Sequence, residues 1–203
     1  QTEGKEFINS SPGVVYRLTP TTETESVYYP VPELIPRGTG TPHELDLTPD
    51  LEELRQAIIA QYGGAPHVEP MTTSVWIFEG YDAIQRGVDA LGDTRDTINL
   101  NTSSTVLGDR PGEAIIVYGV SHAATGKATY SNFGVYGQKA LNGIGGVSNL
   151  DLAGTAEKFI PENPNAQYLY VAKVARDDDP DMVTLVVPSG VGPYGIEPND
   201  PCF

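Results

Sequence analysis

The residues best suited to chemistry gather at the end of one predicted hairpin. Two strand-like runs, 113–122 (EAIIVYGVSH) and 127–137 (KATYSNFGVYG), are joined by the short turn 123–126. A four-residue connection between antiparallel strands would put His122 opposite Lys127. A histidine can exchange a proton near neutral pH, and a lysine can stabilise an oxyanion. The hairpin end is therefore the first candidate for a catalytic site.

Two tyrosines of the same hairpin could add a hydroxyl to that site. Alternation along the strands places Tyr118 on the face that carries His122, and Tyr130 on the opposite face. Either hydroxyl could donate to an anionic or carbonyl ligand. In the alternative interpretation, His122 and Lys127 flank a solvated turn and the tyrosines pack by their rings. No Gly-x-Ser-x-Gly nucleophile motif accompanies these residues, so the sequence leaves open whether the protein is an enzyme.

A second candidate is the run of carboxylates between two predicted strands. Asp177, Asp178, Asp179 and Asp181 lie on one short loop, interrupted only by Pro180. Calcium takes six to eight oxygen ligands, and an acidic loop can supply several of them. The loop lacks the glycine and the distal glutamate of an EF-hand. Calcium is thus the one cofactor that the sequence suggests, and a solvated turn is the alternative.

Histidine and cysteine give no local metal motif. His43, His67 and His122 are far apart, and no two of them have the spacing that puts two imidazoles on one ion. The single cysteine, Cys202, excludes an intrachain disulfide. A transition-metal site would have to be assembled from separate loops.

The charge balance disfavours polyanionic partners. Twelve basic and 27 acidic residues give a formal net charge of −15, and the acids are spread along the whole chain. Nucleic acids and anionic membranes attract cationic surfaces, so we expect no nucleic-acid binding. No apolar run approaches the ~18 residues of a membrane-spanning helix.

Composition points to an exported protein with binding surfaces. Lysine is scarce, Thr, Ser, Tyr and Gly are abundant, and Asn9 and Asn101 begin Asn-x-Ser/Thr sequons, open to glycosylation in an exported protein. We therefore expect an extracellular or periplasmic location. The 11 tyrosines suit contacts with glycans or proteins, and they equally suit a β core.

Hydrophobic patterning predicts many short strands and two helices. Leucine and isoleucine spacing, Pro49 at the helix start and Gly63-Gly64 after it predict a helix over 49–62, with Thr48 as its N-cap. A weaker helical stripe covers 81–91. The glycine-rich stretch 141–147 is predicted to be a loop. Further strands are predicted at 14–19, 26–31, 74–79, 97–102, 168–175 and 182–187.

These elements predict a mainly β (α+β) fold. Strand pairs joined by short loops indicate an antiparallel β-sandwich or a jelly-roll-like fold with two inserted helices. The polar residues 1–13 are predicted to be an N-terminal arm, 14–187 a single β-rich domain, and 188–203 a C-terminal tail.

The sequence is compatible with three functional hypotheses. The first is an exported, noncatalytic structural domain that binds a protein or glycan, or assembles into a homo-oligomer through its terminal arms by adding a strand to an open sheet edge. The second is a small enzyme with a His/Lys/Tyr site at the rim of the 113–137 hairpin. The third is a module stabilised by calcium at the 177–181 loop.

Overall fold

A computed structural model describes residues 6, 10, 13–19, 21, 42–76, 85–87, 98–190 and 195–203. The chain divides into two compact units, Gln1–Ile35 and Pro36–Phe203. In the first unit, residues 14–19 form neither helix nor strand, so the strand predicted there is wrong. The predicted arm 1–13, strand 26–31 and helix 81–91 lie wholly or mostly outside the described residues.

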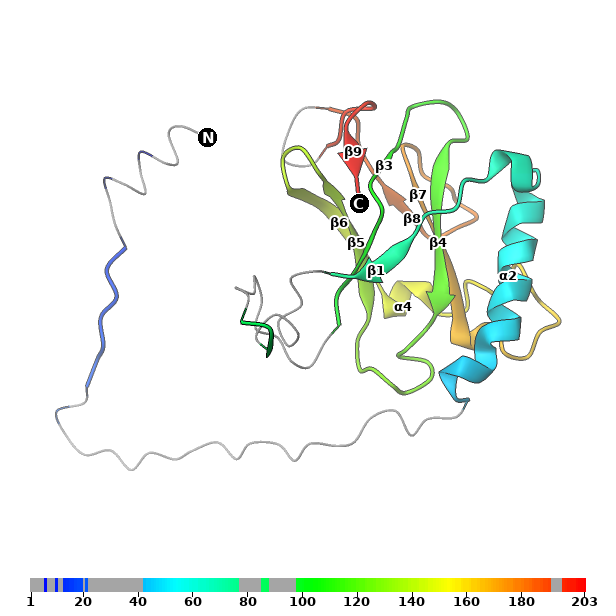
Figure 1. Cartoon of the computed structure of the whole chain (residues 1–203), viewed down its shortest axis with the longest axis horizontal. Helices are drawn as coiled ribbons and strands as arrows, with labels where there is room; N and C mark the ends of the chain where they lie inside the picture. The colour runs from blue at the N-terminus through cyan, green and yellow to red at the C-terminus, as the bar shows by residue number, and fades with distance from the viewer. Residues whose placement is uncertain are drawn as a thin grey trace. The chain divides into compact units, whose positions relative to one another are not determined.

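The described part of Pro36–Phe203 is mainly β, as predicted, with nine strands and two short α-helices (Figure 1). The helices are α2 (Thr48–Gln61) and α4 (Asn149–Leu152), with 3-10 helices η1 (Glu44–Leu47), η2 (Ala65–His67) and η3 (Ala166–Tyr168). The strands are β1 (Thr73–Val75), β2 (Leu100–Thr102), β3 (Thr105–Val106), β4 (Ala114–Val120), β5 (Asn132–Gly137), β6 (Asn142–Ser148), β7 (Leu169–Ala175), β8 (Thr184–Val186) and β9 (Pro201–Cys202).

The strands form three sheets. β4, β7 and β8 make a three-stranded sheet in that order, and β3, β9, β5 and β6 make a four-stranded one, while β1 and β2 form a two-stranded ribbon. All pairs are antiparallel except β7 with β8. The expected antiparallel pairing of β7 with β8 is wrong because residues 176–183 carry the chain back before β8 begins. Lys173 N–H then donates to Val183 O at 2.9 Å.

The two larger sheets share one hydrophobic core. Alternate residues of β7, Ala172 and Val174, are almost completely buried against Val135 of β5 and Val147 of β6. Ile115 and Val117 of β4 pack against the same cluster. This core joins the faces of the two sheets, as a sandwich-like arrangement requires.

The other face of the three-stranded sheet packs against α2. Leu169 and Val171 of β7 are buried with Leu54 and Ile58 of the helix. Figure 1 shows α2 running beside β4. β7 is therefore covered on both faces, which explains why its sequence, LYVAKVA, is apolar at nearly every position.

The predicted helix over 49–62 is confirmed as α2, shifted by one residue. Pro49 lies in its first turn, where a missing N–H costs no hydrogen bond, and Asp50 complements the helix dipole. Thr48 is the first helical residue rather than the N-cap, and its hydroxyl donates to Leu45 O at 2.7 Å.

The predicted hairpin of 113–122 with 127–137 is wrong. β4 pairs with β7 along its whole length, whereas β5 pairs with β6 and β9 in the other sheet. The turn between them sends the chain from one sheet to the other. β7 is the better partner because it pairs with all seven residues of β4 while burying apolar side chains on both faces.

The predicted loop 141–147 is also wrong, since it forms β6. Its glycines fit the neighbouring strand: a Cβ at Gly143 would lie 3.3 Å from the ring of Tyr136 on β5. Glycine therefore lets the Tyr136 ring approach the β6 backbone closely.

Part of the predicted tail 188–203 belongs to the core. Ile196 and Cys202 are 3% and 1% exposed, and β9 lies between β3 and β5. The next residue, Phe203, exchanges two backbone hydrogen bonds with Tyr136, and their rings stack with centroids 5.8 Å apart. The absence of periodicity in this segment hid short pieces of strand that pair only through distant partners.

One side chain, Arg176, joins several of these segments. It follows β7, and its guanidinium donates five hydrogen bonds to backbone carbonyls. The acceptors are Leu107 and Gly108 after β3, Val187 and Pro188 after β8, and Ile196 before β9. The shortest of these bonds are 2.6 Å to Leu107 and 2.7 Å to Ile196.

We expect Arg176→Met to lower the free energy of unfolding by about 2–4 kcal/mol, because it strips several part-buried carbonyls of a charged donor. Urea denaturation measures the change. Arg110→Met is the matched control, since the Arg110 side chain is 86% exposed and an exposed ion pair contributes less than about 1 kcal/mol. Equal losses for the two variants would contradict the role given to Arg176.

Candidate functional site

His122 is held by a carboxylate that the sequence did not single out. Glu44 lies on η1, immediately before α2, and its Oε1 contacts His122 Nδ1 at 2.9 Å. The same oxygen accepts a 2.6 Å hydrogen bond from the hydroxyl of Thr125, whose residue is only 2% exposed. Glu44 therefore ties the start of α2 to the turn that follows β4.

The surroundings of Glu44 favour its charged form. Burial alone would raise the pKa of this carboxyl, but the hydrogen bonds from Thr125 and His122 outweigh that effect and lower the pKa. The positive charges of His122 and Lys127 lower it further. Lys127 thus acts electrostatically on the same carboxylate.

The predicted tyrosines do not join this cluster through any hydrogen bond among the described residues. Tyr118 packs in the core between the sheet and α2. Tyr130 is 61% exposed, and its hydroxyl accepts a 2.6 Å hydrogen bond from Asn132. The structure therefore relates His122 and Lys127 through their effect on Glu44, and it shows no such link for either tyrosine among the described residues.

The imidazole of His122 has the orientation of a carboxylate-held base. Its side chain is 51% exposed, and Nδ1 is the nitrogen bound to Glu44. Such an arrangement can exchange protons with water or a ligand. The Glu44–His122 contact can equally hold η1 against the turn after β4 in a purely structural role. The geometry supports this structural role, because both hydrogen-bond partners of Glu44, His122 and Thr125, lie on that one turn.

Two of the four acids on the acidic loop have lysine partners. Lys173 Nζ lies 2.9 Å from Asp179 Oδ2, with both side chains largely buried. This hydrogen bond is the main reason for the lowered pKa of Asp179. Lys158 donates to the backbone oxygen of Asp181 at 2.8 Å and lies 3.9 Å from its carboxylate. Asp179 and Asp181 therefore already have cationic partners in the protein.

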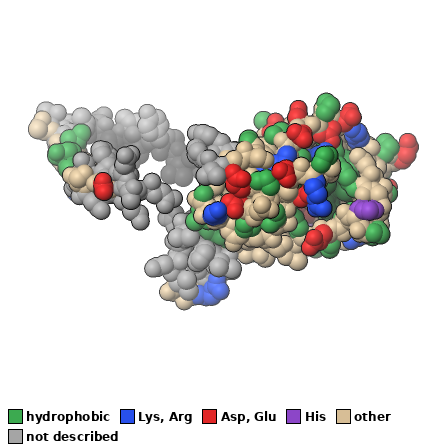
Figure 2. Space-filling model, turned by 90° about the horizontal axis from the view of Figure 1, so that it is seen from above, with side chains coloured by type: hydrophobic (Ala, Val, Ile, Leu, Met, Phe, Trp, Pro, Cys, Tyr) green, Lys and Arg blue, Asp and Glu red, His purple; other side chains and the backbone are tan. Residues whose placement is uncertain are grey.

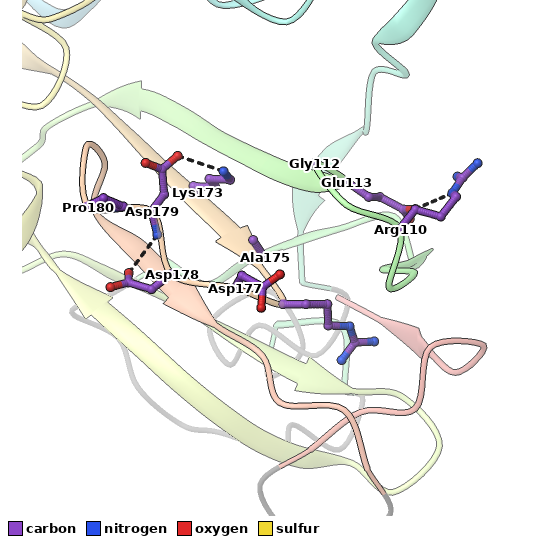
Figure 3. Close-up of a pocket in the computed structure, with 10 residues that line it drawn as sticks. Arg110, Gly112, Glu113, Lys173, Ala175, Asp177, Asp178, Asp179 and Pro180 are labelled. Carbon is purple, nitrogen blue, oxygen red and sulfur yellow. Dashed lines mark hydrogen bonds and ion pairs between the residues drawn. The ribbon is translucent and has the colours of Figure 1, made fainter.

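A shallow pocket of about 230 Å³ opens beside this loop (Figure 3). Its walls carry both signs of charge. Lys173 bonds Asp179 on one side, and Arg110 bonds Glu113 at 2.8 Å on the other. The hydrogen bond from Gly108 N–H, followed by that from Arg110, lowers the pKa of Glu113. Asp179 and Glu113 therefore already have cationic partners. Of the acids that line the pocket, Asp177 and Asp178 are the exposed ones.

Among the described residues, no group of three or more His, Cys, Asp or Glu side chains could hold a metal ion. The calcium hypothesis for Asp177, Asp178, Asp179 and Asp181 therefore gains no support from the geometry. Similarly, no helix within the described ranges is long and apolar enough to cross a membrane.

On the face that Figure 2 shows, the described acidic side chains form no single patch. Figure 2 shows acidic side chains spread over the visible face, with fewer Lys and Arg side chains among them.

Of the two sequon asparagines, Asn101 of β2 is partly exposed, whereas Asn9 lies outside the described residues. The thiol of Cys202 is buried, and burial raises its pKa, which makes it a poor nucleophile at neutral pH.

β4 forms an open edge of the three-stranded sheet. Ser121 N–H donates to Tyr168 O at 2.7 Å, and the register pairs Gly119 with Tyr170. Residues of an antiparallel strand alternate in direction, so the backbone groups of Ala114, Ile116, Tyr118 and Val120 face away from β7. Across the described ranges, these four residues have no backbone hydrogen-bond partner on that side.

The sequence of β4 itself carries none of the features that usually protect an edge strand from pairing. Natural edge strands carry charges, proline or a bulge, or are very short. β4 is seven residues long, reads AIIVYGV and pairs with β7 without a register shift. Its exposed main-chain groups form a template on which another strand can pair.

No protein-family model, curated protein or solved structure matches this chain. The site is therefore interpreted from its own geometry.

The lowered pKa of Glu44 predicts loss of stability in acid. A carboxyl with a depressed folded-state pKa stabilises the fold above its unfolded value, near 4.5, and this contribution disappears as the pH falls through the folded value. We expect Glu44→Gln to lower the free energy of unfolding at pH 7 by about 1 kcal/mol, and to flatten its pH dependence below 4.5. Denaturation at several pH values measures both. Glu69→Gln, at an exposed position, should change neither.

Proposed function

We propose that this protein is an exported, noncatalytic β domain that assembles by accepting an extended strand at the outer edge of β4. The observation that carries this proposal is the open, uncharged edge itself. Ala114, Ile116, Tyr118 and Val120 each offer one N–H and one C=O that β7 does not use. A partner strand in register satisfies these groups together.

The energetics of pairing support a specific interaction. Each main-chain hydrogen bond contributes about 0.5–1.5 kcal/mol net, so four outward residues can supply several kcal/mol before ordering costs. Side chains of an added strand would also extend both cores, because β4 has apolar neighbours on each face. Main-chain hydrogen bonds to β4 then provide the affinity, and the apolar surroundings on both faces of β4 favour strands with apolar side chains.

The charge of the protein sets how such assembly responds to salt. Two copies of a chain with net charge −15 repel each other at low ionic strength. The edge strand itself has no charged residue, so salt screens the repulsion without weakening the pairing. Association should therefore strengthen as salt rises from 20 to about 150 mM.

The Glu44–His122 contact supports this proposal better than it supports catalysis. It fixes the turn immediately after β4, and so holds the end of the open edge in a constant position. No hydrogen bond among the described residues joins Tyr118 or Tyr130 to the cluster, so these hydroxyls add no support to the enzyme hypothesis.

Amide hydrogen exchange at residue resolution tests the proposal on the full chain. In dilute monomer, the outward N–H groups of Ile116, Tyr118 and Val120 should exchange quickly, while those of Val117 and Gly119 stay protected by β7. At concentrations where light scattering detects association, the outward amides should become protected too. Association without a change at these amides would contradict the proposal.

Proline at the two ends of the edge should weaken assembly. Ala114→Pro with Val120→Pro removes two outward N–H donors and leaves the bonds to β7 intact. We expect the dissociation constant measured by analytical ultracentrifugation to rise at least about tenfold. Ala114→Ser with Val120→Ala is the matched control, because it changes the same side chains but keeps both donors. Protection of Val117 and Gly119 verifies that β4 still pairs with β7.

A further inference from the structure

Residues 14–19 have the character of an unpaired strand. Their sequence, VVYRLT, alternates Val14, Tyr16 and Leu18 on one face with other residues on the opposite face. β-Branched and aromatic residues of this kind favour extended pairing. Yet the segment forms no strand, and Val15 and Leu18 are 97% and 90% exposed. A large apolar run left in this condition indicates a partner.

The length of this segment matches the open edge. Gly13 precedes it and Pro20 follows it, and proline has no N–H with which to continue a ladder. Six residues therefore lie between the two breaks, against seven in β4. An antiparallel strand of this size can lie opposite six of the seven residues of β4, and so opposite three of its four outward-facing residues.

The side chains suit a site between two apolar layers. A strand beside β4 would meet the α2 core with one face and the four-stranded sheet with the other. The segment offers apolar residues to both faces: Val14, Tyr16 and Leu18 to one, and Val15 to the other. Arg17, its only charged residue, complements a protein of net charge −15.

We propose that the strand accepted by β4 is residues 14–19 of a second copy of this chain, an inference that rests on the proposed function. In the single chain, both this segment and the outer edge of β4 lack a ladder partner among the described residues. Pairing between two copies gives main-chain hydrogen-bond partners both to residues 14–19 and to the outer edge of β4. Two copies that exchange this segment form a closed symmetric dimer with two identical ladders.

The connection is long enough for such an exchange. Twenty-two residues, 20–41, separate the segment from Pro42, and fully extended they span about 70 Å. The second unit receives this connection close to the end of β4, because Glu44 bonds to His122 just after that strand. The reach therefore exceeds the ~23 Å length of a seven-residue strand several-fold.

A complementation experiment with two full-length variants tests the inference. The edge-blocked chain, Ala114→Pro with Val120→Pro, can donate residues 14–19 but not accept them. The arm-blocked chain, Val15→Pro with Tyr16→Pro, can accept but not donate, because proline at adjacent positions removes donors on both sides of the strand. Each chain alone should be monomeric by light scattering. An equimolar mixture should form a 1:1 heterodimer.

The arm-blocked chain alone should also show a dissociation constant at least tenfold above that of the unmodified chain. Thr2→Pro with Glu3→Pro is the matched control, since it adds the same two prolines outside the segment, and it should associate normally. A synthetic peptide of residues 12–20 should bind the arm-blocked chain and protect the amides of Ile116 and Tyr118 from exchange.

The outcomes separate this inference from the proposed function. If the arm-blocked chain associates like the unmodified chain while the edge-blocked chain does not, a strand other than residues 14–19 covers β4. That result overturns this inference and leaves the proposed function standing. If the edge-blocked chain, with Val117 and Gly119 still protected, associates normally, both fail. If the unmodified chain remains monomeric with its outward β4 amides already protected, the strand does not come from a second copy.

Discussion

Arg176 joins the two larger sheets through one guanidinium group. Five backbone carbonyls from the segments after β3, after β8 and before β9 converge on it, from the end of β7. A carbonyl buried without a donor costs about 1–3 kcal/mol, so these segments would be unfavourable without a cationic fork of this shape. Short strands such as β9 depend on this contact, since two residues cannot define their own position.

The same arrangement explains why one edge stays open. β7 is covered on both faces and paired on both sides, by β4 and by β8. β4 shares both cores, but among the described residues it has a partner strand on one side only. Its side chains are packed, while within the described part of the chain half of its main-chain groups have no partner. Apolar burial therefore holds β4 in place and leaves its edge as the part of this sheet best suited to pair with another chain.

The candidate site was only partly predictable. His122 and Lys127 were identified from an expected hairpin that the structure does not contain, and both residues lower the pKa of one carboxyl, that of Glu44. Their partner Glu44 lies 78 residues before His122, in a segment that carries no motif. Lys173, which pairs with Asp179, lies on β7 outside the acidic loop, so a search for local runs of carboxylates does not find it.

By itself, the sequence determined the local elements: α2, from its 3.6-residue period and Pro49, and the strands β4, β5 and β7, from short runs rich in β-branched and aromatic residues. It also determined the acidic charge. Only the tertiary structure decided that β4 pairs with β7 instead of β5, that β8 runs parallel to β7, and that 142–148 is a strand. Local pattern limits the backbone angles of a segment, whereas its partner is the strand that buries both faces and satisfies the most main-chain groups.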